Sequence, residues 1–218
     1  MAKVPVAGRV KTRLAKGVGV VRATAFFRHT ARAVLGRIGS SPHWQTIIAV
    51  SPDHARLSRA FPAGIARTPQ GGGDLGARLA RAIDRQPPGP VVVVGLDIPE
   101  ITAAPIRKAF SLLGSNDAVF GAADDGGYWL VGLRRRPCSP RIFGRVRWSS
   151  EHALADTLAN LAGKRVAMTG TLGDVDEAAD LTKLEVEPGR RILPVAARHD
   201  CDWIRDASGR LGLSRHLE

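Results

Sequence analysis

The chain has 218 residues, of which 44% are hydrophobic and 24% are charged. This length and balance fit one globular domain with a substantial core, and they exclude wholesale disorder. The sequence contains no run of 18 or more uncharged apolar residues, and its basic N-terminus lacks the apolar stretch of a signal peptide. Its two cysteines, Cys138 and Cys201, have no metal-ligand spacing. We therefore expect a cytoplasmic protein that does not insert into a membrane.

The formal net charge of +12 favours anionic partners, which include nucleotides and nucleic acids. The basic residues are 26 arginines and 6 lysines, and they are scattered apart from Arg134, Arg135 and Arg136. Only 5% of the residues are aromatic, so surfaces on which bases stack are scarce. Nucleic-acid binding therefore stays a less favoured alternative to solvated surface arginine.

The hydrophobic pattern alternates between helical and extended spacing along the chain. In chain order it predicts a helix over 20–38, a strand over 46–51, helices over 52–61 and 73–85, a strand over 91–97, a helix over 102–114, strands over 118–123 and 128–133, and a helix over 149–163.

Alternating strands and helices with short connections predict a three-layer αβα domain with a mixed, mainly parallel sheet. Only four residues separate the strands at 118–123 and 128–133. A parallel crossover needs about a dozen residues, so these two strands should pair antiparallel or turn a sharp corner. We assign residues 1–186 to this domain and 187–218 to a C-terminal appendage of uncertain structure.

The stretch GRVKTRL contains Gly8, Lys11 and Arg13 just before a helix. Backbone N–H groups and two cations there suit an anion such as a triphosphate. The spacing GxxxxGK[ST] of a Walker A loop is absent. The alternative is a set of exposed basic residues without a ligand.

Asp97 stands where the apolar strand VVVVGLD ends. Ligands of open α/β sheets bind beyond the carboxyl ends of the strands. Asp97 is therefore a candidate ligand of Mg²⁺, which proteins bind through one or two carboxylates together with substrate phosphates. A helix cap is the alternative, although Asp97 lies far upstream of the helix that starts near 102.

Two further segments contain acidic residues in chemically suggestive surroundings. In GDVDEAADL, Asp174 and Asp176 alternate and would share a cation if the segment is extended, whereas Asp176 could instead cap a following helix. In GGGDLGARL, Gly73 lets the backbone approach a ligand closely and Asp74 precedes a helix. A nucleotide-contacting loop and an ordinary flexible loop with a cap both remain open.

In combination and order, these motifs resemble one family. The sequence resembles the small bacterial GT-A-like glycosyltransferases, or nucleotide-diphospho-sugar transferases, of the type found beside radical-SAM or selenoprotein-related genes. The motifs that carry the resemblance are the basic glycine loop, QGGGDLGARL, VVVVGLDIPEI, DDGGYWLVGL, a WSS segment and DVDEAADL. Molybdopterin-guanine dinucleotide synthase and 2-phospho-lactate guanylyltransferase are more distant relatives of that family. The resemblance extends from residue 1 to about residue 184.

The resemblance implies a GT-A fold that binds a nucleotide at the strand ends. It makes Lys3, Lys11 and Arg13 the phosphate-contacting cations. It makes Asp97 a ligand of Mg²⁺ or Mn²⁺, with Asp174 or Asp176 as further ligands. The implied reaction transfers either a sugar from a nucleotide sugar or a nucleotidyl group from an NTP to an unknown acceptor. The alternative from another class is a GT-A-fold binding protein that has lost catalysis.

The sequence departs from this family at two places. The family's first strand normally precedes the segment that matches MAKVPVAG, so this sequence begins inside or after that strand. Either the start of the sequence is placed too late, or the central sheet lacks part of a strand. Leu96 stands where the family usually has a small residue before the aspartate, which predicts a narrowed nucleotide site.

The stretch GAADDGGYWLVGL places two aspartates and two glycines between two strands. Gly126 and Gly127 predict a corner that permits positive φ and close approach of a ligand. We expect Asp125 to face the site as an acceptor-side general base and Asp124 to point to solvent. Tyr128 and Trp129 alternate, so one should enter the core and the other should line the pocket.

Overall fold

The computed structural model describes residues 1–136 and 138–186, and the predicted appendage at 187–218 lies outside them. The strands are β1 (Ala2–Lys3), β2 (Ile47–Ser51), β3 (Ala66–Pro69), β4 (Val91–Val94), β5 (Ala118–Ala122), β6 (Tyr128–Leu133) and β7 (Val166–Met168). The helices are α1 (Thr12–Val18), α2 (Val20–Ile38), the 3₁₀ turn η1 (Asp53–Ala55), α3 (Leu75–Asp84), α4 (Ala103–Leu112), α5 (Ala153–Ala159) and α6 (Ala178–Val186).

Most predicted elements are confirmed, and the predicted bounds of α2 and β6 match those of the structure. The predicted strand at 91–97 ends early, at Val94, and the predicted helix at 149–163 is confined to α5. The short elements β1, β3, β7 and α1 were not predicted, because two to seven residues carry too little periodicity.

The predicted helix at 52–61 is wrong, since only the 3₁₀ turn η1 forms there. The Arg67 side chain, from β3, donates hydrogen bonds to the backbone carbonyls of Arg56, Ser58, Phe61 and Pro62 at 2.8–3.1 Å. These carbonyls are satisfied by a guanidinium rather than by helical N–H groups, a long-range contact that local periodicity does not reveal.

The strands form two sheets, in the orders β1-β2-β3 and β4-β6-β5-β7. The first sheet is parallel throughout, and in the second β6 runs antiparallel to both neighbours while β5 and β7 are parallel. The antiparallel pairing of β5 with β6 is confirmed, and with it the mixed, mainly parallel character of the fold.

A cavity of about 430 Å³ separates β2 from β4, so the single continuous sheet that we expected is divided. In β1 only Ala2 and Lys3 pair with β2, and a strand of two residues is too short to join the facing edges. The side chains of β4 are consequently half-buried, although an unbroken apolar run such as VVVV is typical of a strand that is buried on both faces.

Helices cover both faces of the strands and complete the three predicted layers. Side chains of β4 alternate between two cores, with Val92 and Val94 in the first and Val91 and Val93 in the second. The first core packs the strands against α2 and α4, and the second packs them against α3 and residues in and after α5. The αβα class is confirmed.

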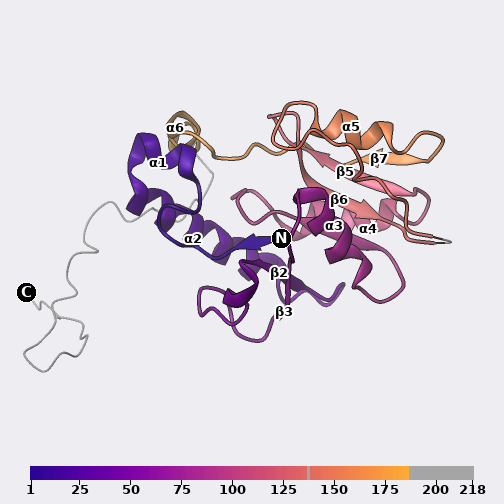
Figure 1. The fold of residues 1–218 in the computed structure, drawn as a ribbon, viewed down its shortest axis with the longest axis horizontal. Helices are drawn as coiled ribbons and strands as arrows, with labels where there is room; N and C mark the ends of the chain where they lie inside the picture. The colour runs from indigo at the N-terminus through magenta and orange to yellow at the C-terminus, as the bar shows by residue number, and fades with distance from the viewer. Residues whose placement is uncertain (137, 187–218) are drawn as a thin grey trace, which may run out of the picture.

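A small helical lobe, formed by α1, the start of α2 and α6, lies beside the sheets. The chain leaves β7 and crosses to α6, which lies next to α1 (Figure 1). Gly17 permits this close packing, because a Cβ there would lie 2.7 Å from the Cβ of Ala178. The lobe has its own core, formed by Leu14, Ala23, Phe26, Val175, Leu181 and Leu184.

Within the described part of the chain, none of the helices is long and apolar enough to cross a membrane. The cytoplasmic location inferred from the cysteine content stays a prediction.

The corner between β5 and β6 depends on Gly126, whose φ is +81°. A Cβ on Gly126 would lie 2.2 Å from the carbonyl oxygen of Glu151, and the Gly126 carbonyl accepts a hydrogen bond from the N–H of Leu154 at 3.1 Å. The predicted corner is therefore present, but the group that approaches Gly126 closely is the chain's own backbone at the start of α5.

Replacing Gly126 should destabilise the protein for that reason. We expect Gly126→Ala to lower the free energy of unfolding by about 2 kcal/mol or more, because it combines an unfavourable positive φ with a backbone clash. Urea denaturation followed by circular dichroism measures the change. Gly72→Ala is the matched control, since Gly72 is exposed and a Cβ there would have no neighbour within 4 Å. Equal stability of the two variants would contradict this account of the corner.

Candidate functional site

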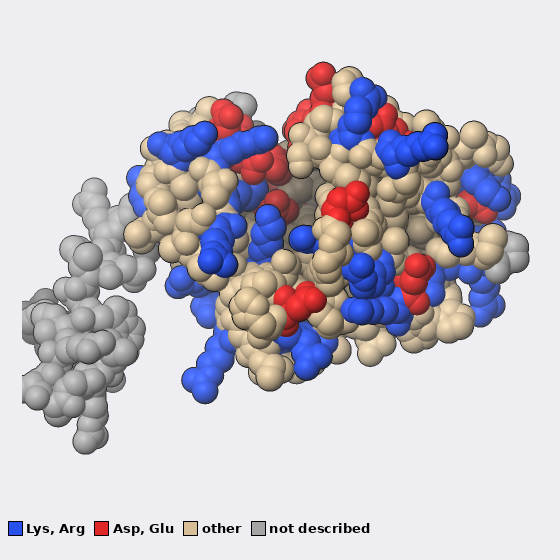
Figure 2. Space-filling model, viewed as in Figure 1, with Lys and Arg blue, Asp and Glu red and all other residues tan. Residues whose placement is uncertain are grey.

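A cleft of about 700 Å³ opens beyond the carboxyl ends of β1 and β4, next to the helical lobe. Figure 2 shows a hollow between the lobe and the body of the molecule, with acidic and basic side chains around it. The charged residues that line the cleft are Lys3, Lys11, Arg13, Asp74, Arg78, Asp97 and Asp176.

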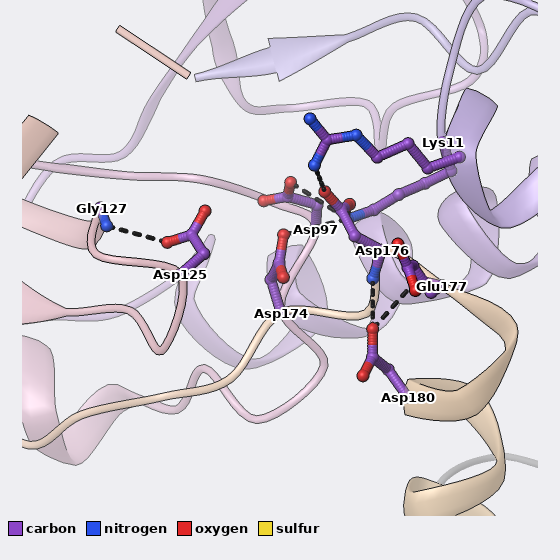
Figure 3. Close-up of polar contacts among 9 residues, drawn as sticks. Lys11, Asp97, Asp125, Gly127, Asp174, Asp176, Glu177 and Asp180 are labelled. Atoms are coloured by element: carbon purple, nitrogen blue, oxygen red, sulfur yellow. Dashed lines mark hydrogen bonds and ion pairs between the residues drawn. The ribbon is translucent and has the colours of Figure 1, made fainter. Parts of the chain in front are cut away.

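Lys11 lies at the centre of the charged cluster, among three aspartates from distant parts of the chain (Figure 3). Its Nζ is 2.7 Å from Asp176 Oδ1, 3.4 Å from Asp97 Oδ2 and 3.6 Å from Asp174 Oδ2. Only 4% of the Lys11 side chain is exposed, whereas 42% of Asp97 is. Arg13 adds a longer contact of 3.7 Å to Asp176 Oδ2.

Local structure explains why both aspartates of the DVD segment reach this cluster. Val175, between them, is buried in the lobe core and anchors the segment beside α1. Asp180, in the first turn of α6, reaches back to the segment, and its Oδ2 accepts hydrogen bonds from the N–H groups of Asp176 and Glu177 at 3.2 and 3.0 Å. The Asp176 carboxylate accepts its hydrogen bond from Lys11.

Lys11 stays charged in this setting. Burial by itself lowers the pKa of its ammonium, but the negative charges of Asp97, Asp176 and Asp174 outweigh burial and raise the pKa above 10.5. For the Asp176 carboxylate, burial raises the pKa. The hydrogen bond and ion pair with Lys11 outweigh burial, so the pKa of Asp176 is lowered.

Asp174 has the opposite balance. Burial raises its pKa to about 6, and the neighbouring charges of Asp176, Asp97 and Asp125 add to the rise, while Lys11 opposes it. The Lys11 ammonium lies farther from Asp174 than from Asp176 or Asp97, so its attraction does not fully offset the burial of the Asp174 carboxylate. The cluster therefore contains more negative charge than Lys11 neutralises.

The glycine-rich loop forms another wall of the cleft. The Asp74 side chain caps α3 by accepting a hydrogen bond from the N–H of Ala77 at 2.8 Å, so the predicted cap is present. Two arginines of α3 fasten the loop, because Arg78 donates to the Gly73 carbonyl and Arg81 donates to the carbonyls of Gln70 and Gly72. A loop held in this way is not the flexible one that we considered.

The structure brings most predicted site residues together. Those that line the cleft are Lys3, Lys11, Arg13, Gly73, Asp74, Asp97 and Asp176. Asp174 joins them through its ion pair with Lys11. Gly8, Asp125, Gly126 and Gly127 are not among the lining residues. Asp125 lies to one side of the cluster, where its Oδ1 accepts a hydrogen bond from the N–H of Gly127 at 2.9 Å (Figure 3).

Several lining residues were missed or only half predicted. Tyr128 and Trp129 both line the cleft. Burial raises the pKa of the Tyr128 phenol to about 12, and Trp129 is only 3% exposed, with its indole N–H donating to the Gly170 carbonyl. The prediction that only one of these two rings would line the pocket is therefore wrong, because each ring packs against a core and also borders the cleft. Arg78, Gln70 and Ser149 also line the cleft, and only the amphipathic spacing of α3 hinted at Arg78. Leu96 is a lining residue but is only 5% exposed, because it packs into the first core.

Three carboxylates that face one cation are the donor set that a hard divalent metal prefers. In the described ranges, however, no three His, Cys, Asp or Glu side chains stand where they could hold a metal ion directly. Lys11 Nζ lies between the carboxylates instead. The residue types therefore suit a hard cation, but to ligate one the three carboxylates would have to draw closer together and the ammonium would have to leave them.

Residues 34–150, more than half of the chain, match the model of a family described as "uncharacterized protein conserved in bacteria (DUF2064)". The chain belongs to this family. The match spans the glycine-rich loop, Asp97 and the β5–β6 corner. Lys11, Asp174 and Asp176 lie outside it. No protein with curated annotation matches the sequence significantly.

Solved structures support the resemblance that the motifs indicated. A proposed nucleotide-diphospho-sugar transferase from Desulfovibrio desulfuricans G20 is 28% identical, with a TM-score of 0.78 over 87% of this chain and 86% of that one. A 4-diphosphocytidyl-2C-methyl-D-erythritol synthase from Anaerococcus prevotii shares the fold at 10% identity, with a TM-score of 0.53 over 71% of this chain and 83% of that one. The nucleotide-diphospho-sugar transferase type of fold is thereby confirmed.

The unfavourable charge of Asp174 should be visible in the stability of the metal-free protein. Because its pKa is raised to about 6 from 3.8, ionised Asp174 destabilises the fold above pH 6, and the penalty shrinks as the pH falls from about 6 towards 3.8. Asp174→Asn should therefore be more stable than wild type at pH 8, on the order of 1 kcal/mol or about 2–4 °C in Tm, since partial exposure screens the charge.

Scanning calorimetry between pH 4 and pH 8 measures both proteins, and the difference in Tm should narrow towards the acid end. Asp84→Asn serves as the control, because Asp84 is exposed at the end of α3 and away from the cleft. A lower Tm for Asp174→Asn at pH 8 would show that the ionised carboxylate stabilises the fold instead.

Proposed function

We propose that this protein is a metal-dependent transferase that binds a nucleotide diphosphate group in the cleft. The group would belong either to a nucleotide sugar, whose sugar is transferred, or to an NTP, whose nucleotidyl group is transferred. Its similarity in sequence and fold to the Desulfovibrio protein supports this general kind of activity. The observation that carries the proposal is the placement of three aspartates around one buried cation at the wall of a basic cleft.

The charges around the cleft support binding of a metal–diphosphate complex. Asp97 and Asp176 line the cleft and Asp174 joins them through Lys11, while Lys3, Arg13 and Arg78 are cations at the lining. A divalent cation held by the aspartates would neutralise charge on the diphosphate. The lysine and arginine side chains would stabilise the charge that develops on the leaving phosphate group.

The two transfer reactions leave different products. Sugar transfer breaks the bond between the sugar and the diphosphate and releases a nucleoside diphosphate, whereas nucleotidyl transfer breaks the bond at the α-phosphorus and releases pyrophosphate. The leaving group carries a diphosphate in both cases, so the same cations would serve either reaction. Detection of the released product decides between the two once the acceptor is known.

Asp97 provides the first test. We expect wild type to bind at least one of GTP, CTP, UTP and common nucleotide sugars more tightly with Mg²⁺ than without it, and Asp97→Asn to lose this Mg²⁺ effect. The amide keeps the volume of the side chain but not the charge that attracts a hard cation. Isothermal titration calorimetry with and without Mg²⁺ measures the effect, which we expect to fall at least about tenfold.

Asp84→Asn again serves as the control and should bind like wild type. If wild type binds none of these nucleotides, the transferase proposal is wrong. If it binds one of them equally well without Mg²⁺ and without the Asp97 charge, the protein is a GT-A-fold binding protein that has lost catalysis.

We also propose Asp125 as the acceptor-side general base. Its carboxylate is exposed beside the cluster and is oriented by the N–H of Gly127. Asp125→Asn should lower kcat about 10²-fold or more and leave nucleotide affinity close to that of wild type, because a base acts on the acceptor and not on the nucleotide. Steady-state kinetics and calorimetry give the two values. Unchanged turnover would end this assignment.

A further inference from the structure

Lys11 occupies the position towards which the proposed metal-binding carboxylates point. Its Nζ is within 3.6 Å of Asp97, Asp174 and Asp176 together, and its hydrogen bond to Asp176 is the shortest of the three contacts. The carboxylates are partly exposed towards the cleft, whereas the lysine side chain is almost completely covered. The ammonium thus acts as the counter-ion of the nucleotide-free site.

A divalent cation and this ammonium cannot share the same carboxylates closely. Like charges at such a distance repel strongly in a partly buried site, and each carboxylate oxygen that Lys11 engages is lost to a metal. A cation that enters from the cleft therefore has to displace the ammonium or leave most of its ligands unused.

The Lys11 side chain is built so that it can move. Its ammonium is a compact charge on a stem of four carbons, which rotates without disturbing the backbone. The same cleft is lined by Lys3, Arg13 and Arg78, so a bound phosphate would offer the released ammonium a new anionic partner.

We propose that Lys11 is an exchangeable counter-ion, which neutralises the aspartates in the empty site and is transferred to the phosphates when a metal–nucleotide complex binds. This inference rests on the proposed function. Its consequence is coupling between the ligands. The metal alone binds weakly because it competes with Lys11, and a nucleotide that attracts Lys11 away strengthens metal binding.

Metal binding by the nucleotide-free protein tests the exchange directly. We expect Lys11→Met, which keeps much of the volume and removes the charge, to bind Mn²⁺ at least about tenfold more tightly than wild type. Electron paramagnetic resonance of free Mn²⁺ gives the Kd without any catalytic assay. Lys16→Met is the matched control, because Lys16 is exposed on the same helix, and it should leave the Kd unchanged.

The outcomes separate this inference from the proposed function. Equal or weaker Mn²⁺ binding by Lys11→Met, with binding by wild type intact, overturns the exchange and leaves the metal-dependent function standing. If neither protein binds Mn²⁺ at millimolar concentration without nucleotide, removal of the ammonium does not open a metal site and the exchange is overturned, whereas the metal dependence is decided by the calorimetric titration of nucleotides with and without Mg²⁺.

Wild-type protein provides a second measurement that does not depend on how the variant folds. Acetic anhydride modifies free lysine amines, and mass spectrometry gives the rate for each lysine. Lys11, tied to three carboxylates, should react slowly in metal-free protein and at least about threefold faster at saturating Mg²⁺, while Lys16 should be unaffected. A Lys11 rate that Mg²⁺ leaves unchanged contradicts the exchange.

Discussion

The ammonium of Lys11 joins three parts of the chain that the sequence keeps far apart. Asp97 follows β4, Asp174 and Asp176 precede α6, and Lys11 precedes α1. Three carboxylates at this distance would repel one another without the cation, and burial strengthens that repulsion. The ion pair between Lys11 and Asp97 therefore links the lobe to the end of β4 at the cleft.

Packing and charge support each other around the cluster. The lobe core holds Val175 beside α1, and Gly17 allows α6 to approach, so hydrophobic contacts bring the aspartates to Lys11. Compensation remains incomplete, because the pKa of Asp174 is raised to about 6. Excess negative charge next to a basic cleft is unfavourable in an empty protein and useful to one that binds a cation with its phosphate. The ionised Asp174 carboxylate thus destabilises the fold at the site, and hydrophobic packing in the cores offsets this cost.

The predicted elements that failed share a physical cause. The helix at 20–38 is determined by its own amphipathic periodicity and the strand at 128–133 by its continuous apolar run, so both are confirmed. The predicted helix at 52–61 does not form, because backbone carbonyls of this segment accept hydrogen bonds from the side chain of Arg67 in β3. Asp176 likewise was a credible helix cap, but its carboxylate accepts a hydrogen bond from Lys11, a residue 165 positions away.

The sequence by itself determined the αβα class, the antiparallel corner and the charged residue types that gather at the cleft, because these follow from periodicity, loop length and side-chain chemistry. Only the tertiary structure decided that Lys11 lies among the three aspartates, that Arg78 and Tyr128 share their cleft, and that Gly126 packs against Glu151 instead of a ligand. These facts depend on contacts across as many as 165 positions of the chain, where local pattern has no influence.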